Sequence, residues 1–267
     1  VKHRIGAAPV LCFTPLKDSS LKLSRYKFNT SFWIKEEPKL VIIAADAGHV
    51  NASLAAVAKD KIGAAPVLCF TPLKDVNYIE AMVGGNLFRA FFDGYLQQNG
   101  QQVFLYGRTP QVKICKNVNW EKENPFPDIF AYTGLNIGYE TDTVRCYWEF
   151  FAPYAVGSLL SALNNKNLFD ITKDKQLRDQ IPRLIAETAA IAAGEGLELD
   201  CEPLVKKLYA APMNYRFPLQ DEINGGGYGE ANLISSVLMN AARSAKIRFM
   251  DSSLNKILKQ IYNLILV

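Results

Sequence analysis

The pattern of hydrophobic and polar residues divides the chain into two halves with different periods. KLVIIAA (39–45) is a mostly apolar, β-branched run, which is typical of a strand buried on both faces of a parallel sheet. NASLAAVAKD (51–60) predicts a helix, and PVLCF (66–70) predicts a second short buried strand. A strand, a helix and a strand in this order indicate one βαβ unit with a right-handed crossover.

The next segments predict antiparallel strands. VNYIEAMVGG (76–85) indicates a helix that ends at glycine. The following segments, FRAFFDGYLQQNG and QQVFLYG, carry turn signals at Asp93-Gly94 and Asn99-Gly100. The sheet is therefore expected to be mixed.

A helical period begins beyond the polar segment KNVNWEKENPFPD (116–128). Apolar residues mark one face of a helix over 177–191, which Pro182 is expected to begin or kink. We therefore expect an α/β domain over 1–122 and an all-helical domain over 123–267, with a ligand-binding cleft between them. Three more segments have the helical pattern: 201–209, 230–245 and 252–267.

Fourteen residues, IGAAPVLCFTPLKD, occur twice without change, at 5–18 and 62–75. A structural repeat normally keeps its period while its residues diverge, because packing tolerates hydrophobic substitutions of similar volume. Here the identity ends at once after Asp18 and Asp75. This favours a recent duplication or an artefact of sequence assignment over a pair of equivalent strands.

Composition excludes several classes of function. With 49% hydrophobic residues and a net charge of +4 spread without a basic run, the chain is not expected to bind nucleic acid or a membrane surface. We expect neither a membrane-spanning helix nor a signal peptide. Five scattered cysteines without a Cys-x-x-Cys pair indicate reduced thiols and a cytoplasmic location. The two histidines, His3 and His49, are too few for a three-histidine zinc site.

Several segments, in order along the chain, resemble the ketopantoate reductase (2-dehydropantoate 2-reductase) family. They cover about residues 39–245 and are LVIIAADAGHVNASL, PVLCFTPLKDVNYIEAMVGG, FFDGYLQQNGQQVFLYG, RCYWEFFAPYAVGSLLSALNNKNLFD, RLIAETAAIAAGEGLELD and YRFPLQDEINGGGYGEANLI. The resemblance implies an incomplete Rossmann-like mixed-sheet domain followed by a helical domain of the 6-phosphogluconate dehydrogenase type. It also implies an NADPH-dependent oxidoreductase of pantothenate biosynthesis that transfers a hydride to a small 2-keto acid, as a monomer or a homodimer.

The resemblance places the candidate substrate residues in the helical half. Glu230, in GYGEAN, corresponds to the family's substrate-side glutamate and is the candidate catalytic residue. Ser158, Asn165 and Asn167 are candidate substrate-binding residues, and Ser161 could supply a further hydroxyl. The alternative interpretations are a carboxylate at a helix N-terminus for Glu230 and capping or turn positions for the asparagines.

The cofactor-binding positions depart from the family pattern. No Gly-x-Gly-x-x-Gly turn follows the first strand, and NGGGYGE (224–230) lies in the helical half without a preceding strand, which indicates a flexible loop. Ala45, Asp46 and Thr71 are the candidate contacts to NADP. However, Asp46 stands where the family has a lysine, and its charge should repel a phosphate. Thr71 stands where the family has an asparagine.

The catalytic positions depart as well. Phe150 stands at the position of the family's catalytic lysine and cannot donate a proton, while Tyr154 and Ser158 replace asparagines. Lys166 and Arg145 are the nearby cations that could substitute, with solvated surface charge as the alternative. Aromatic residues of the same segment are either a cleft lining or, as we favour, core: Tyr147, Trp148, Phe150, Phe151 and Tyr154.

Three functions are compatible with these features. The first is a reductase of the ketopantoate reductase type. The second is a non-catalytic binding or regulatory protein on the same scaffold, which the substitutions favour. The third is a dehydrogenase of the opine or 6-phosphogluconate dehydrogenase type.

Overall fold

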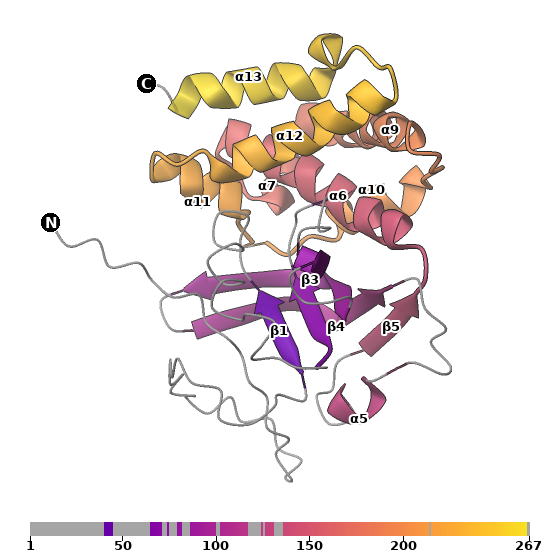
Figure 1. Cartoon of the computed structure of the whole chain (residues 1–267). Coiled ribbons are helices and arrows are strands. Elements are labelled where there is room, and N and C mark those ends of the chain that lie inside the picture. Colours follow the sequence, from indigo (N-terminus) through magenta and orange to yellow (C-terminus); the bar gives the residue numbers. More distant parts are fainter. Residues whose placement is uncertain are drawn as a thin grey trace, which may run out of the picture. The chain divides into compact units, whose positions relative to one another are not determined.

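The computed structural model describes residues 40–44, 65–70, 74, 79–81, 86–99, 102–116, 124, 126–130, 136–213 and 215–265 (Figure 1). Residue contacts divide the chain into two compact units. The sheet unit comprises Val1–Phe92 and Gln111–Thr143, and the helical unit comprises Asp93–Pro110 and Val144–Val267. The domain limits 1–122 and 123–267 stay a prediction, because contact-defined units need not be separately folding domains.

Five strands form one sheet in the order β1-β2-β3-β4-β5. The pairs β1/β2, β2/β3 and β4/β5 are parallel, with Val41 opposite Val67 and Leu68 opposite Phe88. Only residues 100 and 101 connect β3 to β4, so these neighbours must be antiparallel. The mixed sheet that the sequence predicted is confirmed. The strands are β1 (Val41–Ala44), β2 (Val67–Phe70), β3 (Leu87–Asn99), β4 (Gln102–Cys115) and β5 (Asn136–Glu140).

The core of the sheet unit is apolar. Strand β2 lies between β1 and β3, and Val67, Leu68 and Cys69 are at most 1% exposed. Both faces of this strand are therefore covered, which explains its continuous apolar run. Phe88 packs edge-on against Phe126, just before helix α5 (Pro127–Phe130), with ring centroids 4.9 Å apart. The cluster consists of Ile42, Leu68, Phe88, Ala90, Val112, Ile114 and Phe126.

The two strands predicted at 39–45 and 66–70 are confirmed as β1 and β2. The turn predicted at Asp93-Gly94 is wrong, because β3 runs through both residues. Aromatic neighbours in AFFDGYL favour extension, and Asp93 forms an ion pair of 2.6 Å with Lys207 of the helical unit. The predicted helix 51–60 and most of the helix at 76–85 lie outside the described residues, although 79–81 are helical.

The helical unit contains helices over the segments with the predicted apolar period. The helix predicted over 177–191 is divided, however: α8 ends at Arg178 and α9 begins at Gln180. Pro182 lies in the first turn of α9, where its missing N–H removes no hydrogen bond of the helix. Figure 1 shows these helices in pink to yellow. They are α6 (Thr143–Asn164), α7 (Leu168–Lys173), α8 (Lys175–Arg178), α9 (Gln180–Ala193), α10 (Cys201–Tyr209), α11 (Pro218–Asn224), α12 (Gly229–Ser244), η1 (Phe249–Asp251) and α13 (Ser253–Ile265).

Helix α6 is buried along most of its length. Leu159 and Leu160 have no exposed surface, and the exposed fraction of Tyr147, Trp148 and Phe151 is at most 1%. The favoured core-packing interpretation therefore holds for these three aromatic residues. Within the described ranges, even this long helix is not apolar enough over a sufficient length to cross a membrane.

A glycine of α6 allows Phe217 to approach the helix. A Cβ atom at Gly157 would lie 2.5 Å from Cζ of Phe217 and 3.1 Å from a methyl carbon of Leu208. Real Cβ atoms do not come so close to other atoms, because van der Waals repulsion excludes this separation. The absence of a side chain at Gly157 is therefore required for the observed packing.

Candidate functional site on α6 and α12

One side of α6 carries polar residues that the family resemblance places near a substrate. Tyr154, Ser158 and Ser161 are spaced four and three residues apart, so they share one side of the helix. Ser158 and Ser161 are fully buried, and in the described part of the chain neither hydroxyl has a hydrogen-bond partner of standard geometry. Burying a hydroxyl without a hydrogen-bond partner costs free energy. A buried hydroxyl of this kind therefore indicates a position where a water or a ligand can supply the missing hydrogen bond.

Tyr154 joins α6 to α12 through a short hydrogen bond. Its hydroxyl donates to Oε2 of Glu230, in the first turn of α12, at 2.7 Å. Burial raises the pKa of Tyr154 well above its usual value, and the adjacent Glu230 carboxylate raises it further by charge and by accepting the proton. Tyr215 adds to the rise in this pKa, whereas the Ser158 hydroxyl lowers it. Tyr154 is therefore a neutral phenol throughout the neutral pH range.

Aromatic rings fix the orientation of Tyr154. Phe150, one turn earlier on α6, stacks on it at 5.7 Å with an interplanar angle of 13°. Phe217 meets it edge-on at 6.0 Å. Tyr215 packs edge-on against Phe217 at 5.0 Å and against Tyr95 at 4.7 Å. The Tyr154 hydroxyl is thus aimed at Glu230 by a packed aromatic group.

The first turn of α12 is occupied by a carboxylate of the protein. Oε1 of Glu222 accepts the N–H of Gly229, and Oε2 accepts the N–H of Glu230, each at 2.7 Å. A phosphate bound at a helix N-terminus would use the same kind of N–H group. A Cβ at Gly227 would lie 2.5 Å from Cγ of Glu222, so glycine at this position leaves room for the cap. The loop predicted for NGGGYGE is shorter in the structure, because Asn224 belongs to α11 and α12 begins at Gly229.

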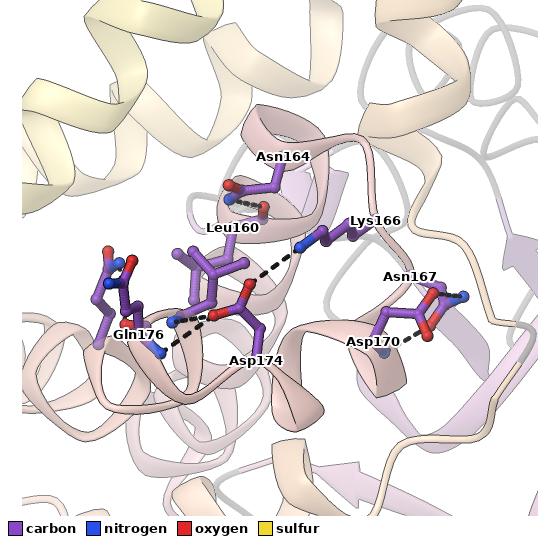
Figure 2. Close-up of polar contacts among 9 residues, drawn as sticks. Leu160, Asn164, Lys166, Asn167, Asp170, Asp174 and Gln176 are labelled. Atoms are coloured by element: carbon purple, nitrogen blue, oxygen red, sulfur yellow. Dashed lines mark hydrogen bonds and ion pairs between the residues drawn. The ribbon is translucent and has the colours of Figure 1, made fainter.

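The two candidate asparagines, Asn165 and Asn167, lie between the end of α6 and the start of α7, and Figure 2 shows Asn167. Asn165 follows α6 with φ 47°, a left-handed conformation that asparagine tolerates better than most residues. Asn167 is the N-cap of α7: Oδ1 accepts the N–H of Asp170 at 2.9 Å, and Nδ2 donates to its carboxylate at 2.6 Å. Both residues have the turn and capping positions that their types indicate, and their role in substrate binding stays a prediction.

Both the side chain and the backbone carbonyl of Lys166, between these asparagines, form hydrogen bonds. Its Nζ lies 3.0 Å from Oδ2 of Asp174, and this hydrogen bond is the main cause that lowers the pKa of Asp174 (Figure 2). Its carbonyl accepts a hydrogen bond of 3.1 Å from Gln220, whose side chain is 2% exposed. Gln220 also accepts the N–H of Phe217 at 3.0 Å and so holds the start of α11. These contacts support a structural role for Lys166.

Arg145, the other candidate cation, donates to the carbonyl of Glu198 at 3.3 Å and is exposed. This matches the alternative interpretation of solvated surface charge. Its proposed substitution for the family's lysine gains no support from this contact.

The three candidate cofactor residues, Ala45, Asp46 and Thr71, lie outside the described residues. In the sequence they directly follow β1 and β2, which are adjacent and parallel. The carboxyl ends of parallel strands form the edge at which dinucleotides bind in open α/β sheets. The contact of these three residues with a cofactor stays a prediction, and the capped N-terminus of α12 does not offer a phosphate site.

Sequence reasoning missed several residues that build the site. Gln220 could have been found, because a glutamine three residues after Phe217 with a proline between them matches a helix-start pattern. Glu222 reaches α12 across a loop, and no local pattern marks such a contact. Tyr215 approaches Tyr154 only through tertiary packing.

Comparison with solved structures shows which known proteins have a similar fold. D-mandelate dehydrogenase, solved with NADH and anilino(oxo)acetate, matches with a TM-score of 0.73 and 17% identity over 87% of this chain and 78% of its own. Two others are named as ketopantoate reductases. The dimeric enzyme from Staphylococcus aureus has a TM-score of 0.70 and 15% identity over 86% and 78% of the two chains. The enzyme from Methylococcus capsulatus has a TM-score of 0.70 and 16% identity over 92% and 83%.

The resemblance to ketopantoate reductases is thus confirmed at the level of the fold. The predicted architecture, a Rossmann-like mixed sheet together with a helical region of the 6-phosphogluconate dehydrogenase type, is confirmed with it. No protein-family model matches the sequence, and no curated protein matches it significantly.

Proposed function

We propose that this protein is a nicotinamide-dependent reductase of a small 2-keto acid, of the ketopantoate reductase type. The observation that carries the proposal is the likeness of fold, which extends over 92% of this chain for the Methylococcus capsulatus enzyme. The D-mandelate dehydrogenase with a similar fold was solved with NADH, which supports a nicotinamide cofactor.

In this proposal, Glu230 is the substrate-side carboxylate, and its position is fixed from two directions. Glu222 holds the backbone N–H of Glu230, and Tyr154 donates to its side chain. Ser158, with its buried and unsatisfied hydroxyl, supplies a hydrogen bond to the substrate. Asn165 and Asn167 bind the substrate from the α6–α7 turn.

Ala45, Asp46 and Thr71 would hold the cofactor at the carboxyl ends of β1 and β2, and NADP is the form that we propose. When bound, the reduced nicotinamide supplies the hydride. The proposal includes reduction of ketopantoate in pantothenate biosynthesis, a cytoplasmic location and a homodimer. The dimeric Staphylococcus aureus enzyme supports the last point.

A specific observation favours a second candidate function, a non-catalytic binding or regulatory protein. Phe150 stacks on Tyr154 at the position where the family resemblance implies a lysine. An aromatic hydrocarbon can neither carry charge nor donate a proton. A protein that keeps the scaffold but lacks this group could bind a nucleotide or keto acid without reducing it.

Two measurements separate these functions. NADPH and NADH are titrated into the protein while nucleotide fluorescence is followed, and turnover is then measured with ketopantoate and with phenylglyoxylate. Saturable binding with turnover supports the reductase, binding without turnover supports the second function, and no binding contradicts the reductase.

Two variants test the role assigned to Glu230. Glu230→Gln is expected to reduce kcat/KM by about 100-fold, because the carboxylate is removed from the substrate side. Glu202→Gln is the matched control: this carboxylate pairs with Lys206 on the exposed surface of α10, so activity should not change. Full activity of Glu230→Gln would contradict the assignment.

A further inference from the structure

We propose that the hydroxyl of Tyr154 donates the proton to the substrate's carbonyl oxygen, and that Glu230 holds this hydroxyl in place. The proposal rests on the reductase function above and deepens it, because it assigns the acid of the reaction. With Tyr154 as the proton donor, reduction does not require a lysine at position 150.

The chemistry of reduction requires such a donor. A hydride from the reduced nicotinamide forms a new C–H bond at the carbonyl carbon, and the π electrons of C=O move to oxygen. That oxygen takes a proton from Tyr154 Oη, which leaves a phenolate, and the phenolate regains a proton from solvent water. A positioned acid at this step is general acid catalysis, which contributes about 100-fold to 10,000-fold in rate.

The geometry supports Tyr154 as that acid. Its hydroxyl lies 2.7 Å from Glu230, the candidate substrate carboxylate, so a substrate held by Glu230 would be next to it. Phe150 has no donor, and its stacking keeps the Tyr154 ring from turning away. The fully buried Ser158 hydroxyl, which we assign to substrate binding, lies on the same side of α6 and already acts on Tyr154 in the direction that favours the phenolate.

The charged and titratable surroundings of Tyr154 define its pH behaviour. Burial opposes ionisation of Tyr154 most strongly, Glu230 of α12 and Tyr215, before α11, oppose it further, and Ser158 of α6 favours it. The phenol therefore keeps its proton at every pH near neutrality, unlike an amine whose pKa is lowered into this range. An alkoxide is more basic than a phenolate, so transfer of the proton to it is still favourable. The expected rate is constant from about pH 6 to about pH 10.

The test compares two tyrosine variants that each remove a hydroxyl bonded to α12. Tyr154→Phe removes the proposed donor. Tyr262→Phe is the matched control, because its hydroxyl also donates at 2.7 Å to an α12 side chain, Asn232, but is exposed. Activity is measured with NADPH and whichever of ketopantoate and phenylglyoxylate is reduced, and NADPH affinity is measured by fluorescence.

We expect Tyr154→Phe to lower kcat by about 100-fold or more with NADPH affinity unchanged, and Tyr262→Phe to keep the wild-type rate. A Tyr154→Phe protein that binds NADPH and keeps its rate within about threefold overturns the donor role but leaves the reductase function standing. Absence of nucleotide binding by the wild-type protein overturns the reductase function and the donor role together.

Two further readouts require no activity of the Tyr154 variant. The wild-type rate should show no decline between about pH 7 and about pH 9, and a decline there would identify another acid and overturn the proposal. Alkaline titration of phenolate absorbance should show the pKa of Tyr154 falling towards its usual value in Glu230→Gln. Burial, the main cause of the raised pKa, remains in this variant, so only the part that Glu230 adds should disappear. A pKa of Tyr154 that does not fall at all would overturn the proposal.

Discussion

The sheet unit and the helical unit differ in the polar groups that they bury. In the part of the chain that the structure describes, the sheet unit buries one polar side chain, Arg89, which donates to the carbonyl of Lys74 at 3.2 Å. Among the described residues, the helical unit instead buries five polar side chains, of which Thr188, Gln220 and Asn255 have hydrogen-bond partners. Ser158 and Ser161 of α6 do not. Thr188, Gln220 and Asn255 thus contribute hydrogen bonds to the helical unit. The burial of Ser158 and Ser161 is not explained by such a contribution to folding.

The largest expected effect concerns the packing of α6. Gly157→Ala should lower the free energy of unfolding by about 1–3 kcal/mol, because overpacking against Phe217 outweighs the better helix propensity of alanine. The matched substitution in the sheet unit, Gly138→Ala in β5, brings the new Cβ no closer than 3.7 Å to another side chain and should be almost neutral. Urea denaturation measures both. Equal losses would show that α6 is not the more tightly packed element.

An intermediate effect is expected at alkaline pH. Burial, followed by the Glu230 charge, raises the pKa of Tyr215 to about 12, and the pKa of Tyr154 is raised as well. Because the folded state holds these protons more tightly than the unfolded state, the contribution of the two tyrosines to stability is complete below about pH 10 and declines as the pH rises further. The decline should be shallower in Tyr154→Phe, as measured by thermal unfolding between about pH 9 and about pH 11.

A group in the sheet unit also lowers the stability of the protein as the pH rises. Burial raises the pKa of Cys69 to about 11, and the Arg89 charge opposes part of the rise. The difference between wild type and Tyr154→Phe therefore isolates the contribution of Tyr154. Identical pH curves for the two proteins would contradict the pKa shift of Tyr154.

The smallest effect is expected for Ser161→Ala, which should leave stability unchanged or raise it by up to about 1 kcal/mol. The substitution removes a buried hydroxyl without a partner, so no hydrogen bond is lost. Thr188→Val is the control: its hydroxyl donates to Leu184 at 2.9 Å, and its loss should cost about 1 kcal/mol. A clear loss of stability in Ser161→Ala would indicate that a bound water satisfies this hydroxyl.

The sequence predicted elements whose pattern is local and missed contacts made at a distance. Strands β1 and β2 and helix α9 follow from apolar runs and periods, because burial imposes those patterns directly. The break between α8 and α9 at Asp179 was not predicted. The Asp93-Gly94 turn failed because tertiary pairing with Lys207 and aromatic neighbours overrode a local signal. In the site, Glu230 came from family resemblance. Its bond to Tyr154 depends on how α6 packs against α12, which no single-segment pattern encodes.

The sequence of β2 has a practical consequence for peptide mapping by mass spectrometry. Trypsin cleavage after Lys61 and Lys74 releases IGAAPVLCFTPLK, and cleavage after Arg4 and Lys17 releases an indistinguishable peptide. Alkylation or deuterium uptake measured on that mass averages Cys69 of β2 with Cys12. A glutamate-specific protease separates the two thiols, because cleavage at Glu36 and Glu80 leaves them on fragments of different mass.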